Sequence, residues 1–132
     1  MPASIVALAG WLLPGAGYLL IRERSRGLTA GITIIALFVL GCFIGGMRVI
    51  DPADSYANLY RAVMQKPWFV AQVLAGPIAL VSALIAKGPS FVVSHARVYE
   101  IGTLYTAVAG MLNLLVIIDC THRAWREGSS RL

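Results

Sequence analysis

The sequence is short of charged residues. Asp, Glu, Lys and Arg together make up 13% of its 132 residues and hydrophobic residues make up 58%, whereas about a quarter of an ordinary soluble domain is charged. This balance excludes a typical water-soluble domain. We therefore expect the chain to lie in a lipid bilayer.

Histidine is absent from every long apolar run, because both histidines, His95 and His122, fall in polar segments. A haem or pigment held across a membrane by axial histidines therefore has no ligand at the required depth. Cys120 and His122 together are too few for a zinc site, which needs three or four ligands. We expect no metal and no cofactor.

Groups typical of enzymes are also scarce. The sequence contains no glycine-rich, lysine-containing phosphate loop. Ser94 and His95 are adjacent, and adjacent side chains point in different directions on a helix or a strand, so they do not form a catalytic dyad. Cys42 and Cys120 are expected at different membrane depths and are interpreted as free thiols. These absences favour a protein that is not an enzyme.

Four apolar stretches dominate what is present. A helix rises about 1.5 Å per residue, so about 20 apolar residues cross a hydrocarbon core of about 30 Å. No residue before Arg22 is charged, which disfavours a signal peptide. We predict an all-α integral membrane bundle of four transmembrane helices forming a single domain over 1–132, with stretches at 4–21, 28–50, 67–86 and 101–118.

Helix-breaking residues interrupt the first and third stretches. Proline inside a helix removes a hydrogen bond and clashes with the preceding turn. The first stretch is therefore either kinked or divided into two re-entrant half-helices at Pro14-Gly15. Each half of the chain has one interrupted stretch followed by one without proline, as two-repeat transporters do. The interrupting residues are Pro14, Gly15, Gly17, Gly76 and Pro77.

Small residues recur every four positions in three of the stretches. Lipid tails are as apolar as leucine, so membrane helices associate through close packing at small side chains rather than through burial alone. We predict helix contacts at these positions, with the four alanines forming one unbroken ridge: Gly41, Gly45, Ala71, Ala75, Ala79, Ala83, Gly102, Thr106 and Gly110.

A short amphipathic helix is predicted at 52–65, between the second and third stretches. Asp51 is suited to the N-cap and Pro52 to the first turn. Tyr56 and Tyr60 recur at helical spacing, which favours a helix lying at the membrane interface. A helix that binds a partner protein is the alternative.

Four polar residues lie within or beside the stretches. Asn113, deep in the fourth stretch, needs a hydrogen-bonding partner, and we expect it to join two helices; Gln72 is similar but nearer a surface. Asp119 is four residues before Arg123, a spacing that pairs them on one helical face. A role in ion or proton transfer is the alternative for Asp119.

The net charge of +5 is spread over all polar segments, which argues against nucleic acid as a partner. Lipid headgroups are a better match. The turn Arg22–Arg26 and the basic tail 119–132 both favour the cytoplasm, but three predicted spans separate them. With four spans these two signals conflict.

Two blocks of sequence carry a resemblance. "WLLPGAGYLLIRERSRGL" is similar to the helix, turn, basic loop and second helix of the TM2-type membrane domain, without that domain's His-Arg-Phe-Tyr run. Together with "EIGTLYTAVAGMLNLLVIIDCTHRA", it makes the chain resemble an uncharacterised family of small bacterial membrane proteins. The resemblance implies about four helices in a bacterial membrane and no known activity.

From the residues we expect a non-enzymatic, multi-pass protein of the bacterial cell membrane, the inner membrane in a Gram-negative cell. Its expected role is that of an accessory or scaffold subunit in a larger membrane complex or a homo-oligomer. A small transporter or channel component, with a path beside the broken helices, is the alternative. A membrane anchor for a soluble partner is a further alternative.

Overall fold

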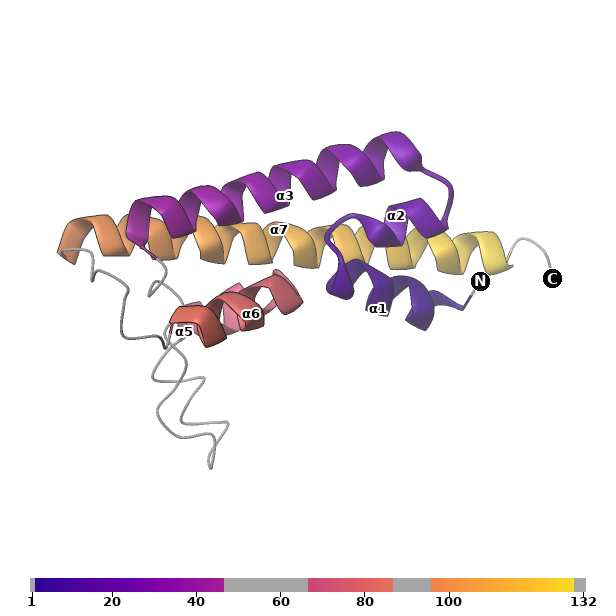
Figure 1. The fold of residues 1–132 in the computed structure, drawn as a ribbon. Helices are drawn as coiled ribbons and strands as arrows, with labels where there is room; N and C mark the ends of the chain where they lie inside the picture. The colour runs from indigo at the N-terminus through magenta and orange to yellow at the C-terminus, as the bar shows by residue number, and fades with distance from the viewer. Residues whose placement is uncertain (1, 47–66, 87–95, 130–132) are drawn as a thin grey trace, which may run out of the picture.

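A computed structural model describes residues 2–46, 67–86 and 96–129. The described residues form only helices and the turns between them, which confirms the all-helical class for this part of the chain. The predicted interfacial helix at 52–65 lies outside the described residues, whereas 119–129 of the basic tail continue the last helix. The helices are α1 (Ala3–Leu12), α2 (Ala16–Leu20), α3 (Arg24–Gly45), α5 (Pro67–Val73), α6 (Pro77–Ala86) and α7 (Ala96–Ser129) (Figure 1).

Two long helices, α3 and α7, pack side by side in opposite directions (Figure 1). Gly41 and Gly45 of α3 lie against Gly102 at the start of α7, while the beginning of α3 lies beside the end of α7. Both helices are long and apolar enough to cross a membrane, over Arg24–Gly45 and Val98–Ser129. The prediction of four spanning helices is therefore wrong for the described residues.

The first apolar stretch is a hairpin rather than one kinked helix. α1 ends at Leu12, Pro14 follows, and Gly15 adopts a left-handed φ of 86° before α2 begins. Glycine has no Cβ and accepts this conformation without strain. Val6 of α1 and Tyr18 of α2 both pack with Cys120 and Ala124 of α7. The chain therefore turns back on itself at Pro14-Gly15.

The third stretch forms a second hairpin. α5 ends at Val73, Gly76 takes a φ of 96°, and Pro77 occupies the first position of α6, where its missing N–H costs nothing. The predicted alanine ridge is therefore divided: Ala71 is on α5 and Ala75 is in the turn. Ala79 and Ala83 are on α6. The four alanines do not form one ridge on a single helix.

The two hairpins lie along α7 from opposite ends. Figure 1 shows α1 and α2 beside the C-terminal half of α7, and α5 and α6 beside its N-terminal half. A central core of Ile34, Phe38, Ala75, Ala79 and Ala109 joins α3, α7 and the second hairpin. This arrangement brings the tips of both hairpins to the middle of α7.

Candidate functional site

The tips of the two hairpins meet at Asn113, whose side chain is fully buried in the middle of α7. Its Nδ2 donates to the backbone oxygen of Gly10 at 3.3 Å and to that of Leu74 at 2.9 Å. Gly10 is in the last turn of α1, and Leu74 directly follows α5. The side-chain amide of Asn113 therefore bonds to the chain at the break in the first stretch and at the break in the third stretch.

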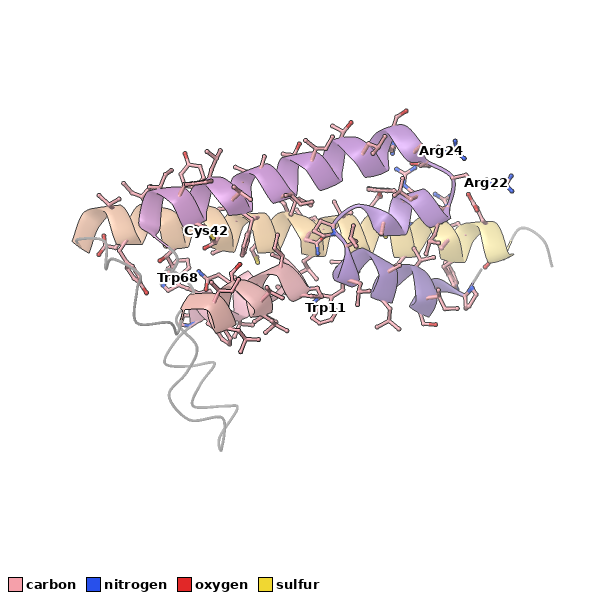
Figure 2. The ribbon with its side chains drawn as sticks, viewed as in Figure 1. Trp11, Arg22, Arg24, Cys42 and Trp68 are labelled. Atoms are coloured by element: carbon pink, nitrogen blue, oxygen red, sulfur yellow. The ribbon has the colours of Figure 1, made fainter. Side chains whose placement is uncertain are left out.

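The two tips also touch each other directly. Trp11 Nε1 donates to the backbone oxygen of Val73 at 3.3 Å. A Cβ atom built on Gly76 would lie 2.2 Å from the backbone oxygen of Trp11, so only glycine fits there. Figure 2 shows Trp11 at the tip of α1, next to the second hairpin. We call the contact of these tips with Asn113 the hairpin junction.

The junction has a chemical rationale in the ends of α1 and α5. The last carbonyl groups of a helix lack partners within the helix, and inside an apolar environment they must find donors elsewhere. The side chains of Asn113 and Trp11 supply such donors. The Asn113 Oδ1 atom is buried and has no hydrogen-bonding partner among the described residues.

Glycines set the distance between the long helices. A Cβ on Gly41 would meet the Thr106 side chain at 2.7 Å, and one on Gly102 would meet the Gly45 Cα at 2.5 Å. The predicted small positions of the second and fourth stretches therefore face each other within the chain. At Gly110 the backbone oxygen of Ala71 is so close that a Cβ would overlap it.

Gln72 lies inside the bundle, between α5 and α7. It is 1% exposed, and its Nε2 donates to Thr106 Oγ1 at 2.8 Å. The Thr106 hydroxyl in turn has the backbone oxygens of Gly102 and Thr103 within 3.1 Å. This chain of hydrogen bonds ties α5 to α7 at the small-residue contact.

A charged cluster closes the opposite end of the bundle. Asp119 Oδ2 accepts from Tyr18 Oη at 2.5 Å and from Arg123 Nε at 2.7 Å. Arg123 Nη1 also contacts Glu23 Oε1 at 3.2 Å, and Glu23 Oε2 contacts Arg26 Nε at 3.3 Å. The ion pair of Asp119 with Arg123 is the one that their spacing predicts. Through Tyr18 of α2 and Glu23 at the start of α3, this ion pair on α7 connects three helices.

Sequence reasoning missed three participants, namely Trp11, Tyr18 and Glu23. Each contacts a residue at least 62 positions away, and no local spacing reports such a contact. The signal for Trp11 was its place immediately before the breaking residues. Tyr18 gave no signal beyond being an aromatic residue with a polar tip.

The described residues contain no group of three or more His, Cys, Asp or Glu side chains placed to hold a metal ion. Cys42 is half-buried and Cys120 is buried, and both are free thiols. Cys120 fills the space beside Gly17, where a Cβ atom would approach the thiol sulfur at 2.5 Å. Its role in this structure is packing between α2 and α7.

Over the part of the chain that the structure describes, the fold is all-helical, with two helices long and apolar enough to cross a membrane and two hairpins that meet at the middle of α7. Residues 5–129 match a family described as "Family of unknown function (DUF6677)", and the chain belongs to this family. Among curated proteins and solved structures, no match to the chain was found.

Proposed function

We propose that the protein is a non-enzymatic, multi-pass scaffold or accessory subunit of a bacterial cell membrane. In this proposal α3 and α7 cross the bilayer, and the two hairpins enter it from opposite sides. The resemblance of its N-terminal block to the TM2-type domain supports the bacterial membrane, although the aromatic-basic run of that domain is missing. The interaction partners are the lipid bilayer and either other membrane subunits or further copies of the chain.

The distribution of polarity supports the membrane. Gln72, Thr106 and Asn113 are buried while large apolar side chains cover the outside, and Phe43 is 82% exposed. In the most apolar 18-residue segment of each long helix, only 28% of α3 and 33% of α7 is buried inside the protein. The core helices of a soluble protein are mostly buried. Apolar side chains facing outward and polar side chains hydrogen-bonded inside the bundle are expected where lipid is the solvent.

The close packing at the hairpin junction supports a scaffold role rather than a transport role. A transport path would need a hydrated opening beside Pro14, Pro77 and Asn113. Pro14 and Asn113 are buried, and the glycines around them are in backbone contact with the facing helices. A rigid bundle that keeps a wide apolar surface outside is suited to docking against other membrane helices.

The first experiment is purification of the tagged full-length chain from its native membrane into nanodiscs, followed by mass measurement of the intact particle. Reproducible recovery with other subunits, or as a defined homo-oligomer, supports the scaffold role. Recovery as a monomer only would overturn it. A Phe43→Ala variant, which alters the most exposed apolar side chain, tests whether α3 forms the docking face; Trp125→Ala, at the opposite end of the bundle, is its matched control.

A small transporter is the second candidate, and one observation favours it. Two half-helix hairpins meet near the middle of the bundle beside the Asn113 Oδ1 atom, which has no partner within the described ranges, and transporters build sites from helix ends in this way. Proteoliposomes containing the wild-type chain would then pass an ion or small solute that Asn113→Leu proteoliposomes retain. Equal leakage from both rules out a path through Asn113.

A further inference from the structure

A groove of about 490 Å³ runs between α2, α3 and α7. Tyr18, Ser25 and Arg26 line one end, and Ile34 and Leu112 line the other. Positions 25 to 34 of a helix span about 14 Å at about 1.5 Å per residue. The groove is therefore elongated along α3, with a polar mouth and an apolar floor.

Two threonine side chains in the wall of the groove already have hydrogen-bond partners within α3. Thr29 Oγ1 donates to the backbone oxygen of Ser25 and Thr33 Oγ1 donates to that of Thr29, both at 2.8 Å. Because both hydroxyl groups are already bonded to their own helix, the wall offers methyl groups and aliphatic side chains. A hydrocarbon chain lies against such a wall without leaving polar groups unpaired.

Arg26 lines the groove, and the end of the bundle at which it lies carries an excess of positive charge. Over 18–26 and 119–129, Arg22, Arg24, Arg26, Arg123 and Arg126 contribute +5, and Glu23, Asp119 and Glu127 contribute −3, which leaves +2. Arg123 and Arg26 share the carboxylates of Glu23 and Asp119. Arg22, in the turn before α3, and Arg24, the first residue of α3, have no acidic partner among the described residues and project outward (Figure 2).

The turn that holds Arg22 has a defined backbone conformation. Glu23 N–H donates to the Tyr18 oxygen and Arg22 N–H donates to the Leu19 oxygen, which closes α2 with a Schellman motif. The left-handed position of this motif is usually glycine, yet here it is Arg22, with φ of 65°. The motif therefore keeps Arg22 in the turn at this end of the bundle, where its side chain is exposed.

We propose that this groove binds one anionic phospholipid, with an acyl chain along α3 and the phosphate at the basic end of the bundle, beside Arg26. The proposal rests on the membrane location proposed above. Charge complementarity selects the anionic headgroup, because basic pockets between membrane helices recruit such lipids. The apolar floor selects a lipid over free phosphate.

The test is titration of the delipidated, full-length protein in detergent with phosphatidylglycerol or phosphatidylcholine of equal chain length, with bound lipid counted by native mass spectrometry. We expect tighter binding of phosphatidylglycerol. Neutralising one arginine should weaken it about fivefold, the equivalent of about 1 kcal/mol per basic residue near a membrane surface. Equal binding of both lipids would overturn the proposal.

Variants separate binding from folding. Arg22→Gly removes a charge but suits the left-handed conformation, so we expect weaker phosphatidylglycerol binding without loss of stability. Thr33→Phe should block the groove, whereas the neighbouring exposed Ile32→Phe should not. Arg26→Gln, which removes the charge that lines the groove, should weaken binding as well, and Arg126→Gln, in the last turn of α7, is the charge control. Equal effects of Thr33→Phe and Ile32→Phe would contradict acyl-chain binding.

Two further measurements identify the cause of a failure. Excess glycerol phosphate, which has no acyl chain, should leave phosphatidylglycerol bound, and displacement would show a phosphate site instead. Flotation with liposomes tests the membrane location separately. A chain that floats but does not discriminate between lipids overturns the groove alone, whereas a chain that does not float overturns the proposed function as well.

Discussion

Glu23 and Arg123, which are 100 residues apart in the chain, form an ion pair with Oε1 and Nη1 separated by 3.2 Å. The turn before α3 and the last turns of α7 are therefore at the same end of the bundle. Two apparently opposed topology signals now agree, because the basic turn and the basic tail are on one side. For the proposed membrane arrangement, the positive-inside rule predicts that this side is cytoplasmic.

This arrangement predicts the labelling of single cysteines. In a Cys42→Ser, Cys120→Ala background, Arg24→Cys and Ser129→Cys should react with a membrane-impermeant maleimide from the same side. Both should be protected in intact cells and labelled in inverted vesicles. Both original side chains are exposed, so the substitutions should not disturb packing. Labelling from opposite sides would restore the four-span topology and contradict the hairpins.

The sequence predicted the helices better than their course. The breaking residues at Pro14-Gly15 and Gly76-Pro77 were visible, and so was the option of half-helices at the first break. Whether a proline kinks a helix or ends it depends on which groups donate hydrogen bonds to the carbonyl oxygens that lose their partners. Asn113 donates at both breaks, 103 residues from Gly10 and 39 from Leu74, and at the second break Trp11 donates to Val73 as well. A local pattern contains no information about such partners.

The small residues also show what a local sequence pattern can and cannot predict. Gly41, Gly45 and Gly102 were predicted as contact positions, and the structure brings them against one another. Periodicity identified the face of each helix, because residues four apart share a face. It did not reveal that a turn at Gly76 divides the alanine series, since the spacing of the alanines continues unchanged across it.

The Gly110 contact predicts a large effect for a small substitution. In Gly110→Ala the new methyl group would overlap the backbone oxygen of Ala71, so α5 must move away from α7. We expect the free energy of unfolding to fall by about 1–3 kcal/mol, as for overpacking. Denaturant titration in mixed micelles measures it.

Gly128→Ala is the matched control, because a Cβ at Gly128 meets nothing within 4 Å. The same exchange there should be neutral or should stabilise α7 by up to about 1 kcal/mol through helix propensity. If both variants change stability equally, helix propensity rather than packing explains the result.

The hydrogen bond from Tyr18 to Asp119 predicts a modest effect at the charged end. Tyr18→Phe keeps the buried ring and removes only the hydroxyl group, which should lower the free energy of unfolding by about 1 kcal/mol. The loss is at the low end for a charged acceptor, because Asp119 is partly exposed and keeps its bond to Arg123. Thermal unfolding in detergent provides the measurement.

Tyr105→Phe makes the same chemical change on the exposed side of α7 and should leave the unfolding temperature unchanged. A loss of stability in Tyr105→Phe as large as that in Tyr18→Phe would mean that the bond to Asp119 contributes nothing specific.

The hairpin junction gives the sharpest prediction. Asn113→Leu leaves the backbone oxygens of Gly10 and Leu74 without this donor inside the bundle. An unsatisfied buried group costs about 1–3 kcal/mol, but interhelical hydrogen bonds in membranes average only about 0.6 kcal/mol and reach about 1.7. We therefore expect a loss of about 1–3 kcal/mol for the pair. Met111→Leu, on the exposed face of α7, is the control and should have no effect.

Trp11→Phe tests whether the two tips act as one unit, since it removes the bond to Val73 at the same junction. If each tip were held independently, the losses from Trp11→Phe and Asn113→Leu would add. Because Asn113 and Trp11 hold the same two chain ends together, freeing one tip weakens the contact of the other. We therefore expect the double variant to lose less stability than the sum, with a coupling energy of at least about 0.5 kcal/mol. Strict additivity in a double-mutant cycle would mean that the hairpins fold against α7 separately and that their meeting contributes no stability.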